Sequence, residues 1–177
     1  IAKSKKKIIN IGIRLNPNTD AKTLKQISTG KKENKFGVNE KKFFELVEYC
    51  KNSKNIELKC LSVHIGSQIL NYKPYEKMLK VVNRIINKTN HKFEFIDLGG
   101  GMGISYEDDD KKLNYKKYNT VIKKFLKKHK SKIIFEPGRS IVGNTGILIS
   151  KIIYIKKNDS KNFIILDAAM NDLIRPA

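Results

Sequence analysis

Segments with the residue spacing of strands alternate with segments that have the spacing of helices, and this alternation constrains the fold more than any other feature of the chain. Strands that are separated by helices pair in parallel through right-handed crossovers. The sequence therefore predicts an α/β fold built on a parallel sheet. The predicted strands are residues 8–15, 58–65, 93–98 and 132–135, and the predicted helices are Glu40–Lys51, a helix opened by Pro74, and a helix with Tyr118, Ile122 and Phe125 on one face.

The pattern changes near residue 143. Residues 146–156 and 162–167 are two further predicted strands, and the break between them, residues 157–161, is too short for a parallel crossover. We therefore expect an antiparallel β region to begin here. The chain divides into two expected domains, residues 1–143 and residues 144–177.

The net charge of +20 suggests nucleic acid or another anionic surface as a partner. However, lysine supplies 33 of the 37 basic residues, and the abundant lysine, isoleucine and asparagine share A/T-rich codons. A mutational bias explains the three excesses together, and the lysines are scattered in short groups rather than interleaved with aromatic residues. The sequence therefore favours a protein that does not bind nucleic acid.

We expect neither a membrane segment nor a secretory signal in this sequence. No run of about 18 apolar residues is present, and residues 1–7 lack the apolar segment of a signal peptide. We expect a cytoplasmic protein without a membrane span, and the two cysteines, Cys50 and Cys60, suit a reducing compartment. The acidic run from Asp108 to Asp110 has no His or Cys beside it, so we expect a solvated loop there and no metal site.

Polar motifs stand at the ends of the predicted parallel strands. Asn16-Pro17 follows the first strand, HIGSQ (residues 64–68) the second, GGGMG (99–103) the third and EPGR (136–139) the fourth. The carboxyl ends of parallel strands meet at one edge of the sheet, which is where parallel α/β folds carry their active sites. We therefore expect a small-molecule site at this edge.

Each motif has a functional and a structural interpretation. The glycines of residues 99–103 allow successive N–H groups to approach an anion, or they form a tight turn; their spacing is neither a dinucleotide fingerprint nor a P-loop. Glu136 and Arg139, on a stiff, sharply turned backbone, suit a ligand site or a surface ion pair. His64 is a ligand-binding residue, with Ser67 as a hydroxyl donor to the same ligand, or a hydrogen-bonded structural residue.

Taken together, the motifs resemble the diaminopimelate decarboxylases, a family of fold-type III, alanine-racemase-like enzymes that use pyridoxal 5'-phosphate (PLP). The resemblance rests on HIGSQ, on DLGGG (residues 97–101), on EPGRSIV (136–142) and on MNDLIRPA (170–177), in collinear order. It implies the C-terminal half of a PLP-binding (β/α)8 (TIM-like) barrel over residues 1–143 and the start of a β domain over residues 144–177. The implied reaction is decarboxylation of the amino acid meso-2,6-diaminopimelate to L-lysine and CO2.

The resemblance also implies a role for each motif. The acid at Glu136 bonds the pyridine nitrogen and keeps it protonated, which makes the ring an electron sink, while the histidine at His64 stacks on the ring. Arg139 and Arg175 hold substrate carboxylates, because the planar guanidinium binds both carboxylate oxygens. The expected cofactor-binding residues are His64, Ser67, Gly101, Glu136, Pro137, Gly138 and Arg139.

The family's catalytic residues are expected outside this chain. Nothing before Ile8 matches the short Tyr-x-x-Lys-type motif of its Schiff-base lysine, and its catalytic cysteine comes from the later part of the β domain of the partner subunit. The chain begins without Met and ends inside a motif. We therefore expect an internal fragment that is inactive alone, from a parent that is a homodimer.

Three alternatives remain open. An ornithine or arginine decarboxylase has the same fold, although residues 171–176 favour diaminopimelate as the substrate. A basic nucleic-acid-binding protein would bind with a steep dependence on salt. A degenerate barrel would bind the PLP phosphate without performing chemistry.

Overall fold

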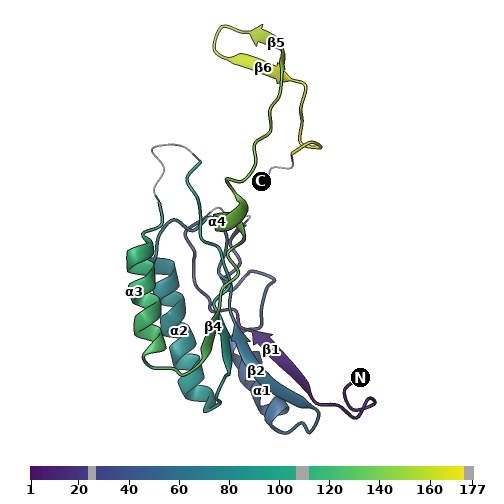
Figure 1. The fold of residues 1–177 in the computed structure, drawn as a ribbon, viewed down its shortest axis with the longest axis vertical. Helices are drawn as coiled ribbons and strands as arrows, with labels where there is room; N and C mark the ends of the chain where they lie inside the picture. The colour runs from purple at the N-terminus through teal and green to yellow at the C-terminus, as the bar shows by residue number, and fades with distance from the viewer. Residues whose placement is uncertain (24–26, 107–111, 174–177) are drawn as a thin grey trace. The chain divides into compact units, whose positions relative to one another are not determined.

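The computed structural model describes residues 1–23, 27–106 and 112–173, in a chain that divides into two compact units, Ile1–Gly143 and Asn144–Ala177. Within the first unit, four strands form one sheet in the order β1-β2-β3-β4, and every neighbouring pair runs parallel (Figure 1). The predicted α/β fold with a parallel sheet is therefore confirmed. The strands are β1 (Ile9–Arg14), β2 (Ile56–Ser62), β3 (Phe95–Asp97) and β4 (Lys132–Ile134).

A helix connects each strand of this sheet to the next. The side chain of Asn39 accepts the Lys42 N–H at 2.9 Å at the start of α1, and Asn114 accepts the Lys117 N–H at 2.9 Å at the start of α3. Proline stands in the first turn of α2, as predicted, and α1 occupies the predicted residues. The helices are α1 (Glu40–Lys51), α2 (Lys73–Thr89), α3 (Tyr115–Leu126) and the short α4 (Gly138–Val142).

One face of the sheet packs against α1, α2 and α3. Ile13, Leu61 and Ile96 are cross-strand partners in adjacent strands, and none is more than 7% exposed. They share one buried cluster with the apolar faces of the helices, and α2 and α3 lie side by side (Figure 1). The helix residues of this cluster include Phe43, Val47, Tyr75, Met78, Val82, Ile85, Tyr118, Ile122 and Phe125.

The opposite face of the sheet is more polar. Arg14 pairs with Ser62, and Ser62 pairs in turn with Asp97; all three residues are half-buried. Because side chains two residues apart on a strand lie on the same face, this polar face leads toward His64 at the end of β2 and toward Glu136 after β4. The sheet therefore carries its polar groups to its carboxyl edge.

The chain turns sharply after β4, as the sequence predicts, but a helix that the sequence does not predict follows the turn. Pro137 has φ −82° and ψ 65°, and the Gly138 N–H donates to the Glu136 carbonyl at 2.9 Å, which together form an inverse γ-turn. The fixed φ of proline also suits the start of a helix. Accordingly, α4 begins at the next residue.

The second unit consists of an antiparallel pair, β5 (Ile152–Lys157) and β6 (Asn162–Leu166), as predicted, although β5 begins six residues later than the predicted strand. Successive residues of a strand point to opposite faces, and apolar side chains at successive positions of β5 and β6 are exposed. Both faces of this strand pair are therefore uncovered; Ile153, for example, is 62% exposed and Ile164 is 59% exposed. The assignment of this unit as the start of a β domain stays a prediction.

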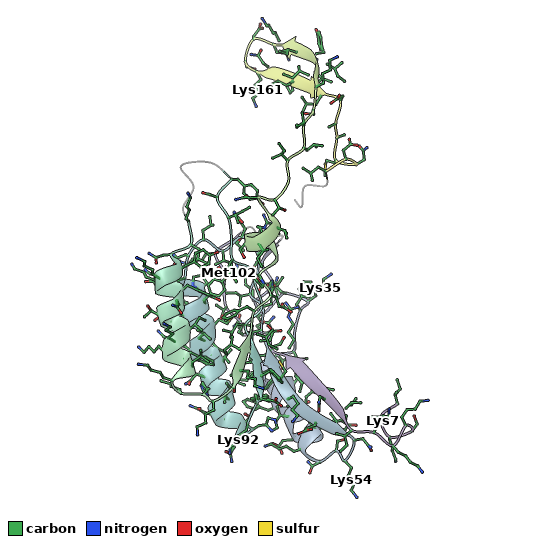
Figure 2. All side chains as sticks on the ribbon, viewed as in Figure 1. Lys7, Lys35, Lys54, Lys92, Met102 and Lys161 are labelled. Atoms are coloured by element: carbon green, nitrogen blue, oxygen red, sulfur yellow. The ribbon has the colours of Figure 1, made fainter. Side chains whose placement is uncertain are left out.

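Arg175 and the acidic run from Asp108 to Asp110, both considered above, lie outside the described residues. Among the residues that are described, no helix is long and apolar enough to cross a membrane. In the first unit, Figure 2 shows Lys35 apart from Lys54 and Lys92.

Candidate functional site

Three loops meet at the carboxyl edge of the sheet, because backbone hydrogen bonds between neighbouring strands continue past the strand ends. The Val63 N–H donates to the Asp97 carbonyl at 2.8 Å, and the Leu98 N–H donates to the Ile134 carbonyl at 3.0 Å. One step further, the Glu136 N–H donates to the Gly99 carbonyl at 2.9 Å. The loops that carry HIGSQ, GGGMG and EPGR are therefore held together at one edge, as the sequence predicts.

His64 contacts the glycine loop directly. Its Nδ1 accepts the Gly100 N–H at 3.1 Å, so the neutral ring carries its hydrogen on Nε2. Burial lowers the pKa of His64 below its usual value, and the positive charge of Arg14 lowers it further, while Asp97 opposes them. The ring is therefore held neutral, with an oriented Nε2–H.

Replacing Arg14 by methionine is expected to raise the pKa of His64 toward its usual value, because a nearby positive charge that disfavours the imidazolium is removed. Burial remains, so the pKa stays below that of a solvated histidine. An NMR titration of the His64 ring measures the change. Arg84→Met is the matched control, because the Arg84 guanidinium is paired with Glu40 on other elements. If the His64 ring titrated with the same midpoint in the Arg14→Met protein and in the unmodified protein, the effect assigned to the Arg14 charge would be contradicted.

The glycine loop fits between its neighbours only without side chains. A Cβ at Gly100 would overlap the Glu136 carbonyl oxygen, and a Cβ at Gly101 would overlap the Gly66 carbonyl oxygen. Gly99 and Gly101 also have positive φ, 65° and 85°, which glycine adopts most easily. Packing of the three loops therefore accounts for these glycines, which supports the tight-turn interpretation.

The same loop also keeps a feature of an anion cradle. The Gly99 N–H donates to Asp97 Oδ1 at 2.8 Å and the Gly100 N–H donates to His64, but the Gly101 N–H has no acceptor among the described residues. Backbone N–H groups of this kind bind phosphate oxygens. Gly101 therefore offers a donor at the place where the resemblance expects the cofactor phosphate.

Among the ion pairs of the described residues, none joins Glu136 and Arg139. Instead, Arg139 Nη1 donates to the Tyr106 hydroxyl at 2.6 Å, and its guanidinium lies 5.8 Å from the centre of the Tyr106 ring. Glu136 is exposed. The space beside Gly138 is also open, because no heavy atom lies within 4 Å of the position that a Cβ at this residue would take. The interpretation of this motif as a surface ion pair is therefore not supported.

Ser67 is held through its backbone. Its N–H donates to the Ile27 carbonyl at 3.0 Å, and its carbonyl accepts the Thr23 hydroxyl at 2.8 Å. The neighbouring segment contains Ser28, whose buried hydroxyl has no hydrogen-bond partner among the described residues. Hydroxyls and a free N–H at this edge fit the phosphate of a cofactor, which accepts several hydrogen bonds.

Two residues that shape the edge were not assigned a role from the sequence. The Tyr75 hydroxyl, fully buried on α2, donates to the Gly100 carbonyl at 3.1 Å. Burial also raises the pKa of Tyr75, so the hydroxyl keeps its proton. The available signal was a tyrosine on the apolar face of a predicted helix, because a buried tyrosine hydroxyl needs a partner. The other residue is Gln68, whose amide contacts the backbone of Ile104.

The chain belongs to the pyridoxal-dependent decarboxylases, because residues 1–143 match the model of the pyridoxal binding domain of that family. Among curated relatives, the diaminopimelate decarboxylase of Aquifex aeolicus (strain VF5) is 45% identical over 170 residues, which cover 94% of this chain and 40% of the relative. The chain therefore spans about two fifths of the length of the curated relatives that it matches.

Solved structures agree with this assignment. The crystal structure of diaminopimelate decarboxylase from Helicobacter pylori complexed with L-lysine matches with a TM-score of 0.89 and 42% identity, over 99% of this chain and 44% of that chain. The arginine decarboxylase of Paramecium bursaria Chlorella virus matches with a TM-score of 0.73 and 25% identity, over 91% of this chain and 42% of that chain. The resemblance seen in the motifs, the fold class and PLP as the cofactor of the family are confirmed.

Proposed function

We propose that residues 1–177 form one wall of the active site of an enzyme that decarboxylates meso-2,6-diaminopimelate to L-lysine and CO2. The observation that carries the proposal is the convergence of His64, the glycine loop and Glu136 at one edge of the sheet, joined by hydrogen bonds to Gly99 and Gly100. Membership of the pyridoxal-dependent decarboxylases supports the reaction type. The names of the similar curated proteins support the substrate.

In this proposal, PLP supplies a protonated aromatic ring that withdraws electrons from the substrate carbon as CO2 departs. The Glu136 carboxylate holds the proton at the pyridine nitrogen. The neutral ring of His64, which the Gly100 N–H keeps in place, would stack on the cofactor ring. Arg139, beside Tyr106, and Arg175 bind substrate carboxylates through charge-assisted hydrogen bonds.

The phosphate of the cofactor is proposed to bind between two loops. Gly101 supplies its N–H group, Ser67 its hydroxyl, and the turn at Pro137 and Gly138 closes the other side with Arg139. The short inverse γ-turn at Pro137 supports this arrangement, because it turns the chain sharply directly after Glu136, whose N–H is bonded to the Gly99 carbonyl.

We further propose that residues 1–143 are part of a PLP barrel and residues 144–177 the start of a β domain. In the complete enzyme, the Schiff-base lysine and the catalytic cysteine come from residues outside 1–177, and the cysteine belongs to the partner subunit of a homodimer. The enzyme is proposed to act in the cytoplasm, on a small amino acid and not on nucleic acid.

A substrate comparison tests the proposed reaction. We expect the complete enzyme, loaded with PLP, to release CO2 from meso-2,6-diaminopimelate with a kcat/KM about 100-fold or more above the values for L-ornithine and L-arginine. Diaminopimelate has a second carboxylate, and the groups that bind it are left unpaired when ornithine or arginine occupies the site. Arginine is the serious competitor, since a solved arginine decarboxylase shares the fold. A higher kcat/KM for arginine or ornithine would overturn the assigned substrate, and binding of PLP without CO2 release from any of the three would favour a degenerate barrel.

A further inference from the structure

Gln68 links the HIGSQ loop to the glycine loop through its side-chain amide. Its Nε2 donates to the Ile104 carbonyl at 2.6 Å, and its Oε1 accepts the Ile104 N–H at 3.2 Å. One amide side chain thus satisfies both backbone groups of one residue, as a neighbouring strand would. Gln68 itself has φ 56°, a left-handed conformation that is uncommon for a residue with a side chain.

The amide extends a short ladder between the two loops. Ile69 and Met102 form a parallel bridge, in which the Ile69 N–H donates to the Gly101 carbonyl at 2.9 Å and the Gly103 N–H donates to the Ile69 carbonyl at 3.1 Å. The two bonds from the Gln68 side chain continue this ladder to Ile104. Figure 2 shows Met102 well away from Lys54 and Lys92, which lie at the other end of the first unit, so the ladder lies toward the edge that carries the candidate site.

The ladder fixes the separation of the two loops next to the expected phosphate site. Ser67 directly precedes Gln68, and Gly101, whose N–H has no acceptor among the described residues, pairs with Ile69 through its carbonyl. The fit is close, because a Cβ at Gly103 would lie 3.0 Å from Gln68 Oε1. Loss of the amide would leave the two backbone bonds of Ile69 in place but would remove the two bonds that tie Gln68 to Ile104, so the Ser67 side of the site would be held less firmly against the Gly101 side.

We propose that Gln68 is a positioning residue, which sets the spacing between Ser67 and Gly101 and thereby forms the pocket for the cofactor phosphate. This inference rests on the proposed function, because it takes the phosphate of PLP to bind between these two residues. Gln68 touches neither the cofactor ring nor the substrate in this proposal. Its effect should therefore depend on the phosphate group alone.

The test compares binding of PLP with binding of pyridoxal, which lacks the phosphate, to the complete apoenzyme. Gln68→Met removes both hydrogen bonds at similar side-chain length. It is expected to weaken PLP binding about tenfold, a change in binding free energy close to the net contribution of one hydrogen bond. Pyridoxal binding is expected to change less than about threefold, since no phosphate contact is involved. Absorbance titration of the cofactor yields both dissociation constants without any assay of activity.

Gln68→Glu is a second, nearly isosteric variant that loses only the donor and adds a negative charge. We expect it to weaken PLP binding more than Gln68→Met does, because the charge repels the phosphate, and again to leave pyridoxal binding nearly unchanged. The control is Asn83→Leu, which removes an amide that contacts His129 at 2.9 Å, just before β4 begins and thus at the other edge of the sheet. It is expected to alter neither dissociation constant.

Equal losses for PLP and pyridoxal in both Gln68 variants would overturn the inference, because they would indicate a general structural role. Unchanged PLP binding would overturn it as well. The proposed function fails separately: an unmodified enzyme that binds PLP more tightly than pyridoxal but does not decarboxylate diaminopimelate contradicts the assigned reaction, while a phosphate-selective loss in the variants still supports the role of Gln68.

Discussion

Replacing Glu136 by glutamine in the complete enzyme is expected to lower the rate of decarboxylation by about 10²- to 10³-fold, the usual cost of removing one group that stabilises developing charge. In the proposed site the carboxylate holds a proton on the pyridine nitrogen, and a neutral amide does this poorly. The backbone of residue 136 is bonded to Gly99 and Gly138, and glutamine preserves those bonds. The loss should therefore appear in kcat rather than in folding.

The matched control is Glu94→Gln. Glu94 lies just before β3, at the amino edge of the sheet, where it pairs with Lys59 at 3.3 Å and with Lys132 at 3.8 Å. These pairs are at least partly exposed and far from the candidate site, so the control enzyme should decarboxylate at nearly the unmodified rate. A Glu136→Gln enzyme as active as the Glu94→Gln enzyme would refute the role proposed for Glu136.

Replacing Gly100 by alanine is expected to lower the free energy of unfolding by about 3 kcal/mol, the upper part of the range for overpacking a closely fitted position. The added methyl group would overlap the carbonyl oxygen of Glu136, which is backbone and cannot rotate away. The two loops must then separate, which also moves His64 away from the Gly100 N–H. Urea denaturation of the complete protein, followed by circular dichroism, measures the loss.

Gly138→Ala serves as the control for this change in stability. No heavy atom lies within 4 Å of the position that its Cβ would take, and Gly138 opens α4, where alanine is a better helix former than glycine. Its free energy of unfolding should therefore equal or exceed that of the unmodified protein. If Gly100→Ala and Gly138→Ala unfold at the same urea concentration, the close contact between the glycine loop and Glu136 does not exist in solution.

The sequence allowed the order of the elements and the edge at which the motifs meet to be predicted, because both follow from local patterns. The residues of α1 were predicted correctly from the spacing of Phe43, Val47 and Cys50, all of which are buried. The convergence of His64 and Glu136 followed from a general property of parallel sheets rather than from any contact between them. Periodicity and topology are thus sufficient for the outline of the candidate site.

The contacts that hold the site together were not predictable, because they join residues far apart in sequence. The Tyr75 hydroxyl reaches Gly100 across 25 positions, and the Gln68 amide reaches Ile104 across 36 positions. The helix α4 was missed because Pro137-Gly138 signals a turn, and the turn is indeed formed before the helix begins. The position of Arg175 lies outside the described residues, so its proposed contact with substrate stays a prediction.

The close fit of Gly100 has a consequence for the order in which the protein folds. Its two partners, His64 and Glu136, lie 36 residues before it and 36 residues after it, so neither contact arises from nearby chain. Contacts of such long range form late, after the intervening helices have brought the strands together. A nascent polypeptide that has emerged from the ribosome only as far as α3 lacks Glu136, so the close packing of Gly100 against that residue cannot yet form.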